Sequence, residues 1–279
     1  MKVDAAKGLA INARRIRAKL VDFIRDELLK ARYGRLVIGL SGGVDSAVSA
    51  FLGVEAVGAA NVVGVLMPYR ASQPSSVTDA MAVVNKLGIK HHAIDITAPV
   101  DALAKEFGLS GDDNAARLRL GNIMPRVRMI TLYDMSVRER ALVLGTSNKT
   151  ELLLGYGTLY GDVACAINPL GDLYKTQVWQ LAKRLRVPDG IIAKKPTADL
   201  WPGQTDEGEL GLEYAEADKL LYLMLDRKLS EAKLFEAGFA PEFIGRVKRL
   251  ILANQFKRRG PAVAQIARRK PNKDFEILK

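Results

Sequence analysis

Residues 36–46, Leu-Val-Ile-Gly-Leu-Ser-Gly-Gly-Val-Asp-Ser, decide the fold, because a short apolar run leads there into a glycine-rich turn. The run is too short for a helix and is flanked by turn residues, so it predicts a buried strand. Similar apolar runs follow at residues 62–67, 91–96 and 141–144. Segments with helical periodicity separate them, at residues 46–57, 76–87 and 123–138. Strands that alternate with helices predict an α/β fold with an open, mostly parallel sheet and helices on both faces.

Helical sequence flanks this α/β region on both sides. Apolar residues recur at helical spacing within residues 6–32, which predicts one amphipathic helix that ends before Gly34. Loop-rich sequence begins near Asp189, and two or three helices are expected between Glu213 and Phe256, before a basic tail. The prediction is a single domain over residues 1–279, with a helical C-terminal part at about 213–279.

Composition restricts the function classes. With 279 residues, 48% of them hydrophobic and 26% charged, the chain can bury a sizeable core. The 42 Lys and Arg against 31 Asp and Glu leave a net charge of +11, which favours anionic partners. A single cysteine, Cys165, excludes an internal disulfide framework and any multi-cysteine metal site. Charges interrupt the first twenty residues and no segment is apolar for long enough to span a bilayer, so we expect a soluble, cytoplasmic protein without membrane partners.

The residues after the strands are the first candidates for a site. In open parallel sheets, ligands bind beyond the carboxyl ends of the strands, where the strand order reverses. The segments after Leu40, Met67 and Leu144 are therefore expected to line a ligand crevice.

The loop Gly39–Ser46 has the chemistry of a phosphate site. Its small residues allow main-chain N–H groups to converge on an anion at the start of the next helix. The lysine of a G-x-x-x-x-G-K-[ST] loop is absent, and Asp45 stands at the phosphate end instead. A carboxylate would repel phosphate unless a divalent cation lay between them, so Asp45 is predicted to be a Mg²⁺ ligand. The alternative is an ordinary strand-to-helix turn in which Asp45 and Ser46 are capping residues.

This loop resembles the SGGxDS pyrophosphate loop of the N-type ATP pyrophosphatases. The resemblance implies a Rossmann-like, adenine nucleotide alpha hydrolase-like fold. It also implies cleavage of ATP between the α and β phosphates, an adenylated intermediate and release of pyrophosphate.

A second polar run, Gly145-Thr-Ser-Asn-Lys-Thr-Glu151, follows the strand expected at 141–144, so it should face the first loop. Glu151 could give the cation a second carboxylate, and Thr146 could give the nucleotide a hydroxyl. The alternative is that both residues serve the start of a helix, by capping and by a favourable charge.

Four motifs, one of them the run at 145–151, resemble ammonia-dependent NAD synthetase. They are Arg126-Val-Arg-Met129, the GTSNKTE run, Ile167-Asn-Pro-Leu-Gly-Asp-Leu-Tyr-Lys-Thr-Gln177, and PTADL at 196–200 with PGQTDE at 202–207. The resemblance implies amidation of deamido-NAD with ammonia, driven by ATP, through an adenylated nicotinate carboxylate. The products would be NAD, AMP and pyrophosphate. It further implies Mg²⁺, a cytoplasmic location and a homodimer.

The same resemblance implies roles for individual residues. ATP would contact Gly39, Leu40, Ser41, Gly42, Gly43, Val44, Asp45, Ser46, Thr146, Lys175 and Thr197. Mg²⁺ would be held by Asp45 and Glu151, and deamido-NAD by Arg126, Asp162 and Lys257. Asp45 and Lys175 are the expected catalytic residues; Lys175 opens a helix, where a flexible cation could neutralise charge on the phosphates. The chain departs from common family residues at Leu159, Ala166 and Phe256, all implied to touch the dinucleotide.

Two other readings remain open at this point. The charge and the basic tail, with Arg268-Arg269-Lys270, favour a tRNA-modifying relative, although that tail lacks interleaved aromatic residues. A nucleotide-binding regulatory module without turnover is the second. A glutamine-dependent enzyme would need a reactive cysteine, whereas Cys165 lies in the apolar run Val-Ala-Cys-Ala-Ile. The expected nitrogen source is therefore free ammonia, or ammonia handed over by a separate protein.

Overall fold

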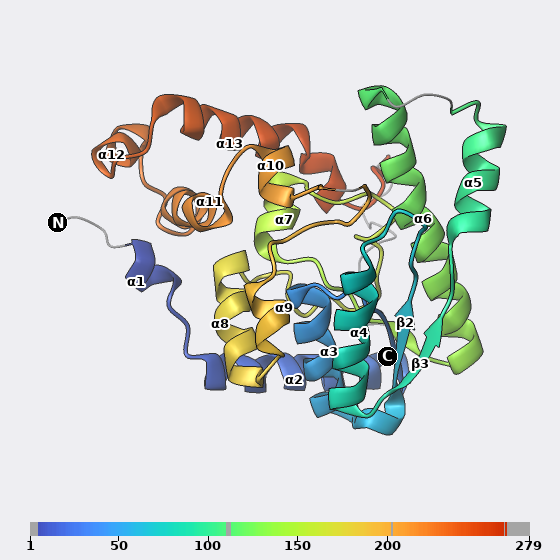
Figure 1. Ribbon diagram of the computed structural model, residues 1–279. Coiled ribbons are helices and arrows are strands. Elements are labelled where there is room, and N and C mark those ends of the chain that lie inside the picture. Colours follow the sequence, from blue (N-terminus) through green and yellow to red (C-terminus); the bar gives the residue numbers. More distant parts are fainter. Residues whose placement is uncertain (1–4, 110–112, 202, 265, 267–279) are drawn as a thin grey trace.

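The computed structural model describes residues 5–109, 113–201, 203–264 and 266. Its centre is a parallel sheet in the order β3-β2-β1-β4 (Figure 1). The strands are β1 (Leu36–Gly39), β2 (Val62–Leu66), β3 (Lys90–Ala93) and β4 (Leu142–Val143). The chain moves outward from β1 to β2 and β3 and then returns to the other side of β1 for β4. The strand order therefore reverses between β1 and β4, and the predicted α/β fold is confirmed.

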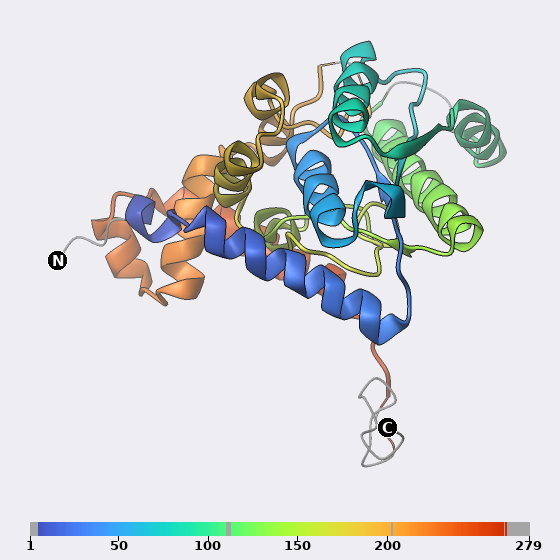
Figure 2. The same cartoon turned by 90° about the horizontal axis from the view of Figure 1, so that it is seen from below.

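Alternation along β1 divides the core into two layers. Leu36 and Ile38 face α2, α3, α4 and α8, whereas Val37 faces α5 and α6. Figure 2 shows α2 lying across the base of the first layer. These helices are α2 (Ala13–Ala31), α3 (Val44–Val57), α4 (Pro74–Leu87), α5 (Thr97–Glu106), α6 (Asn114–Glu139) and α8 (Lys175–Leu185).

The predicted N-terminal helix is wrong as a single unit. It is divided into α1 (Ala5–Leu9) and α2, because Asn12 caps α2 by accepting from the amide of Arg15 at 3.0 Å. Gln180 of α8 bonds to the amide of Ile11 and the carbonyl of Leu9, which satisfies the backbone at the break. The helix also ends at Ala31, three residues before Gly34, with Arg32 in the left-handed conformation.

α6 is longer than the predicted helix at 123–138. It begins at Asn114, where the Asp113 side chain accepts from the amide of Ala116 at 2.7 Å, and it carries Pro125 in its interior. Proline usually marks the first turn of a helix, and this preference misplaced the predicted start.

The C-terminal helices form a second hydrophobic cluster beside the sheet domain. Tyr214, Leu220, Ile244 and Val247 are fully buried in it, together with Leu9 of α1. The elements of this cluster are α7 (Lys149–Leu154), α10 (Asp206–Leu210), α11 (Tyr214–Leu221), the π-helical turn η2 (Tyr222–Asp226), α12 (Glu231–Glu236) and α13 (Pro241–Ala253). The short helix α9 (Asp189–Ala193) packs instead on the first layer through Ile191. Two 3₁₀ turns, η1 (Ala59–Asn61) and η3 (Gln255–Arg258), complete the structure. The predicted helices at 213–256 are confirmed, and the basic run at 268–270 lies outside the described residues.

None of the helices described is long and apolar enough to cross a membrane.

Candidate active site

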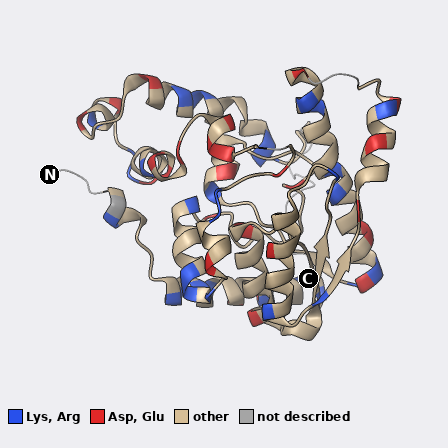
Figure 3. Ribbon diagram, viewed as in Figure 1, with Lys and Arg blue, Asp and Glu red and all other residues tan. Residues whose placement is uncertain are grey.

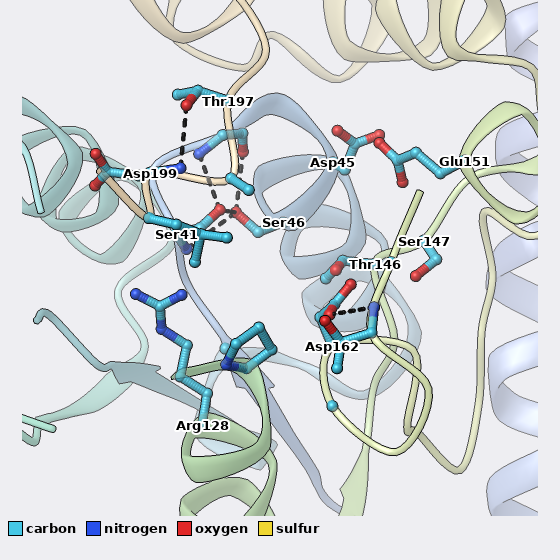
Figure 4. A pocket seen from close by; sticks show the side chains of 18 of the residues that line it. Ser41, Asp45, Ser46, Arg128, Thr146, Ser147, Glu151, Asp162, Thr197 and Asp199 are labelled. Carbon is cyan, nitrogen blue, oxygen red and sulfur yellow. Dashed lines mark hydrogen bonds between the residues drawn. The ribbon is translucent and has the colours of Figure 1, made fainter. Parts of the chain in front are cut away.

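A cavity of about 440 Å³ opens at the carboxyl ends of β1, β2 and β4. The loops after these strands line it, as the topology predicted, and α6, the segment 194–206 and Lys257 close its sides. Figure 4 shows the side chains that meet there. The ligand crevice thus lies where the strand order reverses.

The glycine-rich loop is shaped by its own serines. Ser46 Oγ donates to the carbonyl of Gly43 at 2.9 Å and accepts from the amide of Ser41 at 3.3 Å. The amide of Gly43 donates in turn to Ser41 Oγ at 3.2 Å. Two loop amides therefore have partners inside the loop, whereas the sequence predicted amides turned toward an anion. A phosphate at this loop would exchange these hydroxyl partners for its own oxygens.

Gly42 cannot carry a side chain in this loop. Its φ is +76°, and a Cβ atom there would lie 2.3 Å from the carbonyl oxygen of Ser76 in α4. We expect Gly42→Ala to displace the loop from α4, at a cost of roughly 1–3 kcal/mol in backbone strain plus the clash. The resemblance of this loop implies that it binds ATP, so the KM for ATP should rise at least tenfold, as measured by steady-state kinetics beside thermal unfolding.

Gly88→Ala is the matched control for this prediction. Gly88 also has a left-handed φ, of +63°, but open space surrounds the position of a Cβ atom. It should lower stability without changing the KM for ATP. Equal KM values for the two alanine variants would contradict the role of the close approach at Gly42.

Two carboxylates and a lysine converge on the floor of the cavity. Lys175 Nζ lies 2.6 Å from Asp45 Oδ2 and 3.0 Å from Glu151 Oε1. Asp45 is in the first turn of α3, Glu151 in the first turn of α7, and Lys175 is the first residue of α8. Asn148 donates from Nδ2 to Asp45 Oδ1 at 3.0 Å, so the two polar loops are joined directly. The structure therefore brings together all three residues that were predicted to serve metal and catalysis.

Burial sets the charges of this cluster. Lys175 is only 2% exposed, so it is not a solvated surface lysine. Burial opposes its charged form, but the adjacent Asp45 and Glu151 raise the pKa of Lys175 above its usual value. Burial raises the pKa of Glu151 against the attraction of Lys175, and the charge of Asp45 adds to the rise. The Lys175 ammonium thus stays charged between the two acidic side chains.

Glu151 also serves the start of helix α7, as the alternative prediction proposed. Its Oε2 accepts from the amide of Asn148 at 3.1 Å, and Asn148 Oδ1 accepts from the amide of Glu151 at 3.0 Å, which is a capping box. This cap fixes the direction of the carboxylate and leaves Oε1 toward Lys175. Capping and a cavity role are therefore compatible.

The donor set fits Mg²⁺ in a nucleotide site. In the described part of the chain, no group of three or more His, Cys, Asp or Glu residues could enclose a metal ion. Asp45 and Glu151 nevertheless point toward one another and share the cation of Lys175 (Figure 4). Mg²⁺ at phosphate sites is typically held by one or two carboxylates, with the remaining ligands from phosphate and water.

The threonines predicted to contact ATP both line the cavity. Thr146 follows β4, and Thr197 lies across the cavity, where its Oγ1 accepts from the amide of Asp199 at 3.0 Å. They face the glycine-rich loop from two sides (Figure 4).

Arg128 is a cavity residue to which the sequence assigned no role. Its Nε donates to the carbonyl of Met67 at 3.2 Å, and its guanidinium points into the cavity near Asp199 (Figure 4). Burial lowers the pKa of Arg128 below its usual value, while Asp199 and Asp162 oppose the shift. A signal was present, because Gly121, Pro125 and Arg128 share one face of α6 at spacings of four and three.

The three residues assigned to the dinucleotide surround one loop at 155–162. Lys257 Nζ donates to the carbonyls of Gly155 and Gly157 at 2.8 and 2.9 Å, and Asp162 Oδ1 accepts from the amide of Thr158 at 2.9 Å. Arg126 donates to the carbonyl of Leu159 at 3.2 Å. Asp162 and Lys257 line the cavity, whereas Arg126 is exposed on the outer side of α6 and does not.

A tyrosine and two carboxylates at the cavity wall were also missed. Tyr156 Oη lies 3.0 Å from Asp206 Oδ1 and 2.6 Å from Glu209 Oε2, and Gln204 Nε2 donates to Glu209. Burial raises the pKa of Asp206, and the attraction of Lys175 counteracts the rise. Gln204 and Asp206 belong to the quoted run at 202–207, and Glu209 lies two residues beyond it, so the run itself pointed to this part of the wall.

The fold and the site define an α/β protein whose glycine-rich loop borders a cavity beside a lysine and two carboxylates. The family model described as NAD synthase matches residues 16–261, and the chain belongs to that family. A relative from Chlorobium phaeobacteroides (strain BS1), named NH(3)-dependent NAD(+) synthetase, is 50% identical over 93% of this chain and 92% of its own length. A relative of the same name from Trichlorobacter lovleyi is 49% identical over 96% of each chain.

Solved structures agree with this assignment. An NH3-dependent NAD synthetase from Campylobacter jejuni has a TM-score of 0.77 at 34% identity, over 92% of this chain and all of that one. An NMN synthetase from Francisella tularensis has a TM-score of 0.80 at 32% identity, with the same coverage. Family membership does not favour the tRNA-modifying alternative, and Figure 3 shows Lys and Arg interspersed with Asp and Glu over the helices.

Proposed function

We propose that this chain amidates deamido-NAD with ammonia and converts ATP to AMP and pyrophosphate. The convergence of Asp45, Glu151 and Lys175 beside the glycine-rich loop is the observation that carries the proposal. Relatives that are about half identical over nearly the whole chain support the same reaction. A biosynthetic enzyme of this kind belongs in the cytoplasm.

The reaction needs activation of a carboxylate, which is a poor electrophile. An oxygen of the nicotinate carboxylate attacks the α-phosphorus of ATP, and the bond to the β-phosphate breaks, which releases pyrophosphate. Ammonia then attacks the acyl carbon of the adenylate, loses a proton, and AMP departs with the carboxylate oxygen. Lys175 neutralises charge on the phosphate oxygens, and the loop Gly39–Ser46 positions them, so positioning and electrostatics suffice without a protein nucleophile.

Asp45 and Glu151 are proposed to hold Mg²⁺ when ATP is bound. The ion would neutralise phosphate charge and orient the α-phosphate. Together with Thr146, Thr197 and Lys175, these residues form the proposed ATP site. Asp162 and Lys257 are proposed to hold the dinucleotide, with Arg128 opposite them in the cavity.

A homodimer through α6 is proposed from its exposed apolar side. Ile130 is 61% exposed and Val137 80% exposed, and Tyr133 lies between them on the same face. Arg126 extends this stripe by one turn. Its exposure is then explained, because the partner subunit would cover it beside the dinucleotide.

The double variant Ile130→Glu/Val137→Glu tests the dimer. It should halve the mass measured by light scattering while the circular dichroism spectrum stays unchanged. Leu252→Glu/Phe256→Glu, on the C-terminal helical side where both residues are likewise exposed, is the matched control and should keep the wild-type mass. A mutated α6 that leaves the mass unchanged would exclude this interface.

Cys165 is not expected to take part in nitrogen transfer. Burial raises the pKa of its thiol to about 11, so the thiolate is scarce at neutral pH. Cys165→Ala should therefore leave kcat with ammonium chloride within about twofold of wild type. Loss of activity with ammonium, in a protein that still unfolds at the wild-type temperature, would contradict this expectation.

An assay of amide formation tests the function. Deamido-NAD and nicotinic acid mononucleotide are compared as acceptors, each with ammonium or glutamine, and AMP and pyrophosphate are quantified. We expect turnover of deamido-NAD with ammonium alone. Preference for the mononucleotide would instead assign the activity named for the Francisella structure.

A further inference from the structure

A buried aspartate behind the cavity joins the helices that carry Glu151 and Lys175. Asp218 of α11 is fully buried and is not among the cavity-lining residues described. Its Oδ1 accepts from the hydroxyl of Thr150 at 2.5 Å. Its Oδ2 accepts from the amide and the hydroxyl of Thr176 at 2.8 and 2.7 Å. Thr150 directly precedes Glu151, and Thr176 directly follows Lys175.

The hydroxyl of Thr150 completes the connection. Its Oγ1 also accepts from the amide of Lys175 at 3.0 Å. A hydroxyl has one hydrogen, which is donated to Asp218, so every donor in this small network has one defined acceptor. A buried network in which every member is satisfied is rigid, and it holds the first turns of α7 and α8 in one relative position.

α11 supports Lys175 at two points. The ring of Tyr214, one turn before Asp218 on the same helix, lies 5.0 Å from Lys175 Nζ. Asp218 fixes the backbone of Lys175, while Tyr214 provides an aromatic face for its ammonium. A buried carboxylate is costly to maintain, and its two oxygens here serve only the neighbours of Glu151 and Lys175.

We infer that Asp218 is a positioning residue for the adenylation step. By binding the starts of α7 and α8 to one carboxylate, it sets the separation between Glu151 and the ammonium of Lys175. It touches neither substrate nor phosphate and acts through these two residues. The inference rests on the proposed function, since the separation matters only if both side chains act on ATP.

Asp218→Asn is the direct test. Asparagine has the same shape, but its Nδ2 would face Thr150 Oγ1, which already accepts from the amide of Lys175. The measurement is exchange of labelled pyrophosphate into ATP, dependent on deamido-NAD and without ammonia, per titrated active site. We expect kcat to fall about 100-fold while the KM for ATP changes less than threefold, because misplacement affects the transition state more than ground-state binding.

A second pair of variants, at Thr150, tests the same network without changing Asp218. Thr150→Val keeps the shape and loses the hydroxyl, and should lower exchange about as much as Asp218→Asn. Thr150→Ser keeps the hydroxyl and should restore exchange to within threefold of wild type. The double variant Asp218→Asn/Thr150→Val should exchange pyrophosphate no more slowly than the slower of the two single variants, since both substitutions break the same network.

Glu139→Gln is the matched control. Glu139 is also a buried carboxylate, 6% exposed, but it is the last residue of α6, accepts from Lys90 Nζ at 2.7 Å and does not line the cavity. It should lower the unfolding temperature and leave exchange per active site unchanged. The inference is overturned if Asp218→Asn exchanges as fast as Glu139→Gln, or if Thr150→Ser falls as far as Thr150→Val. A wild-type enzyme without exchange would refute the proposed function, and the inference with it, before any variant is compared.

Discussion

Lys175→Met should lower kcat for amide formation about 1,000-fold, the scale on which a cation that stabilises phosphoryl transfer contributes. Methionine fills a similar volume but removes the ammonium that lies within 3.0 Å of both Asp45 and Glu151. The two carboxylates then face one another without compensation, so repulsion at the phosphate oxygens is added to the loss of stabilisation. Steady-state rates at saturating ATP and deamido-NAD measure the effect.

Lys183→Met is the control for this variant. It removes the same charge from the same helix, but Lys183 is exposed in the last turn of α8. We expect wild-type kcat. If Lys175→Met were also to retain more than a tenth of the wild-type rate, Lys175 would not stabilise the transition state.

Asp45→Asn should lower kcat at least 100-fold and increase the Mg²⁺ concentration needed for half-maximal rate. The amide keeps the bond from Asn148 in reach but withdraws a full negative charge from the proposed ion site. A second readout is binding: the stabilisation of the protein by ATP, measured by thermal unfolding, should lose its dependence on Mg²⁺. Glu151→Gln should behave in the same direction.

Glu55→Gln is the control for Asp45→Asn, because it removes a carboxylate from the same helix but not from the proposed ion site. Glu55 also lies on α3, ten residues after Asp45, and it pairs with Arg17 at 2.6 Å instead of facing the cavity. Its variant should retain the wild-type Mg²⁺ response. An Asp45→Asn enzyme with an unchanged Mg²⁺ dependence would show that the ion is held elsewhere.

The sheet and the glycine-rich loop were predictable because their signals are local. β1 is buried on both faces, so it reads as a continuous apolar run, and the turn after it follows from small residues. β3 was placed less well, because it lies at an edge and its residues Lys90–Ala93 are mostly exposed. The break between α1 and α2 escaped detection, since Gln180, far along the chain, satisfies the backbone there.

The sequence predicted which residues belong to the site better than it predicted how they are arranged. The strand ends indicated that Asp45 and Glu151 would meet, and they do. Lys175 was expected as a mobile helical lysine, because sequence alone does not show that α11 and Tyr214 cover it. Arg128 was passed over for Arg126 although the helical phase of α6 distinguishes them. Asp218 carries no motif, and only its contacts reveal it.

The central claim is that the two carboxylates and Lys175 promote attack of a substrate carboxylate on the α-phosphate of ATP. Deamido-NAD labelled with ¹⁸O in its carboxylate tests this most directly, with the AMP analysed by mass spectrometry after turnover with ammonium. One ¹⁸O atom in each AMP formed is the expected result, since the oxygen that joins the acyl group to phosphorus leaves with AMP. Unlabelled AMP, or ADP with the label in inorganic phosphate, would contradict it.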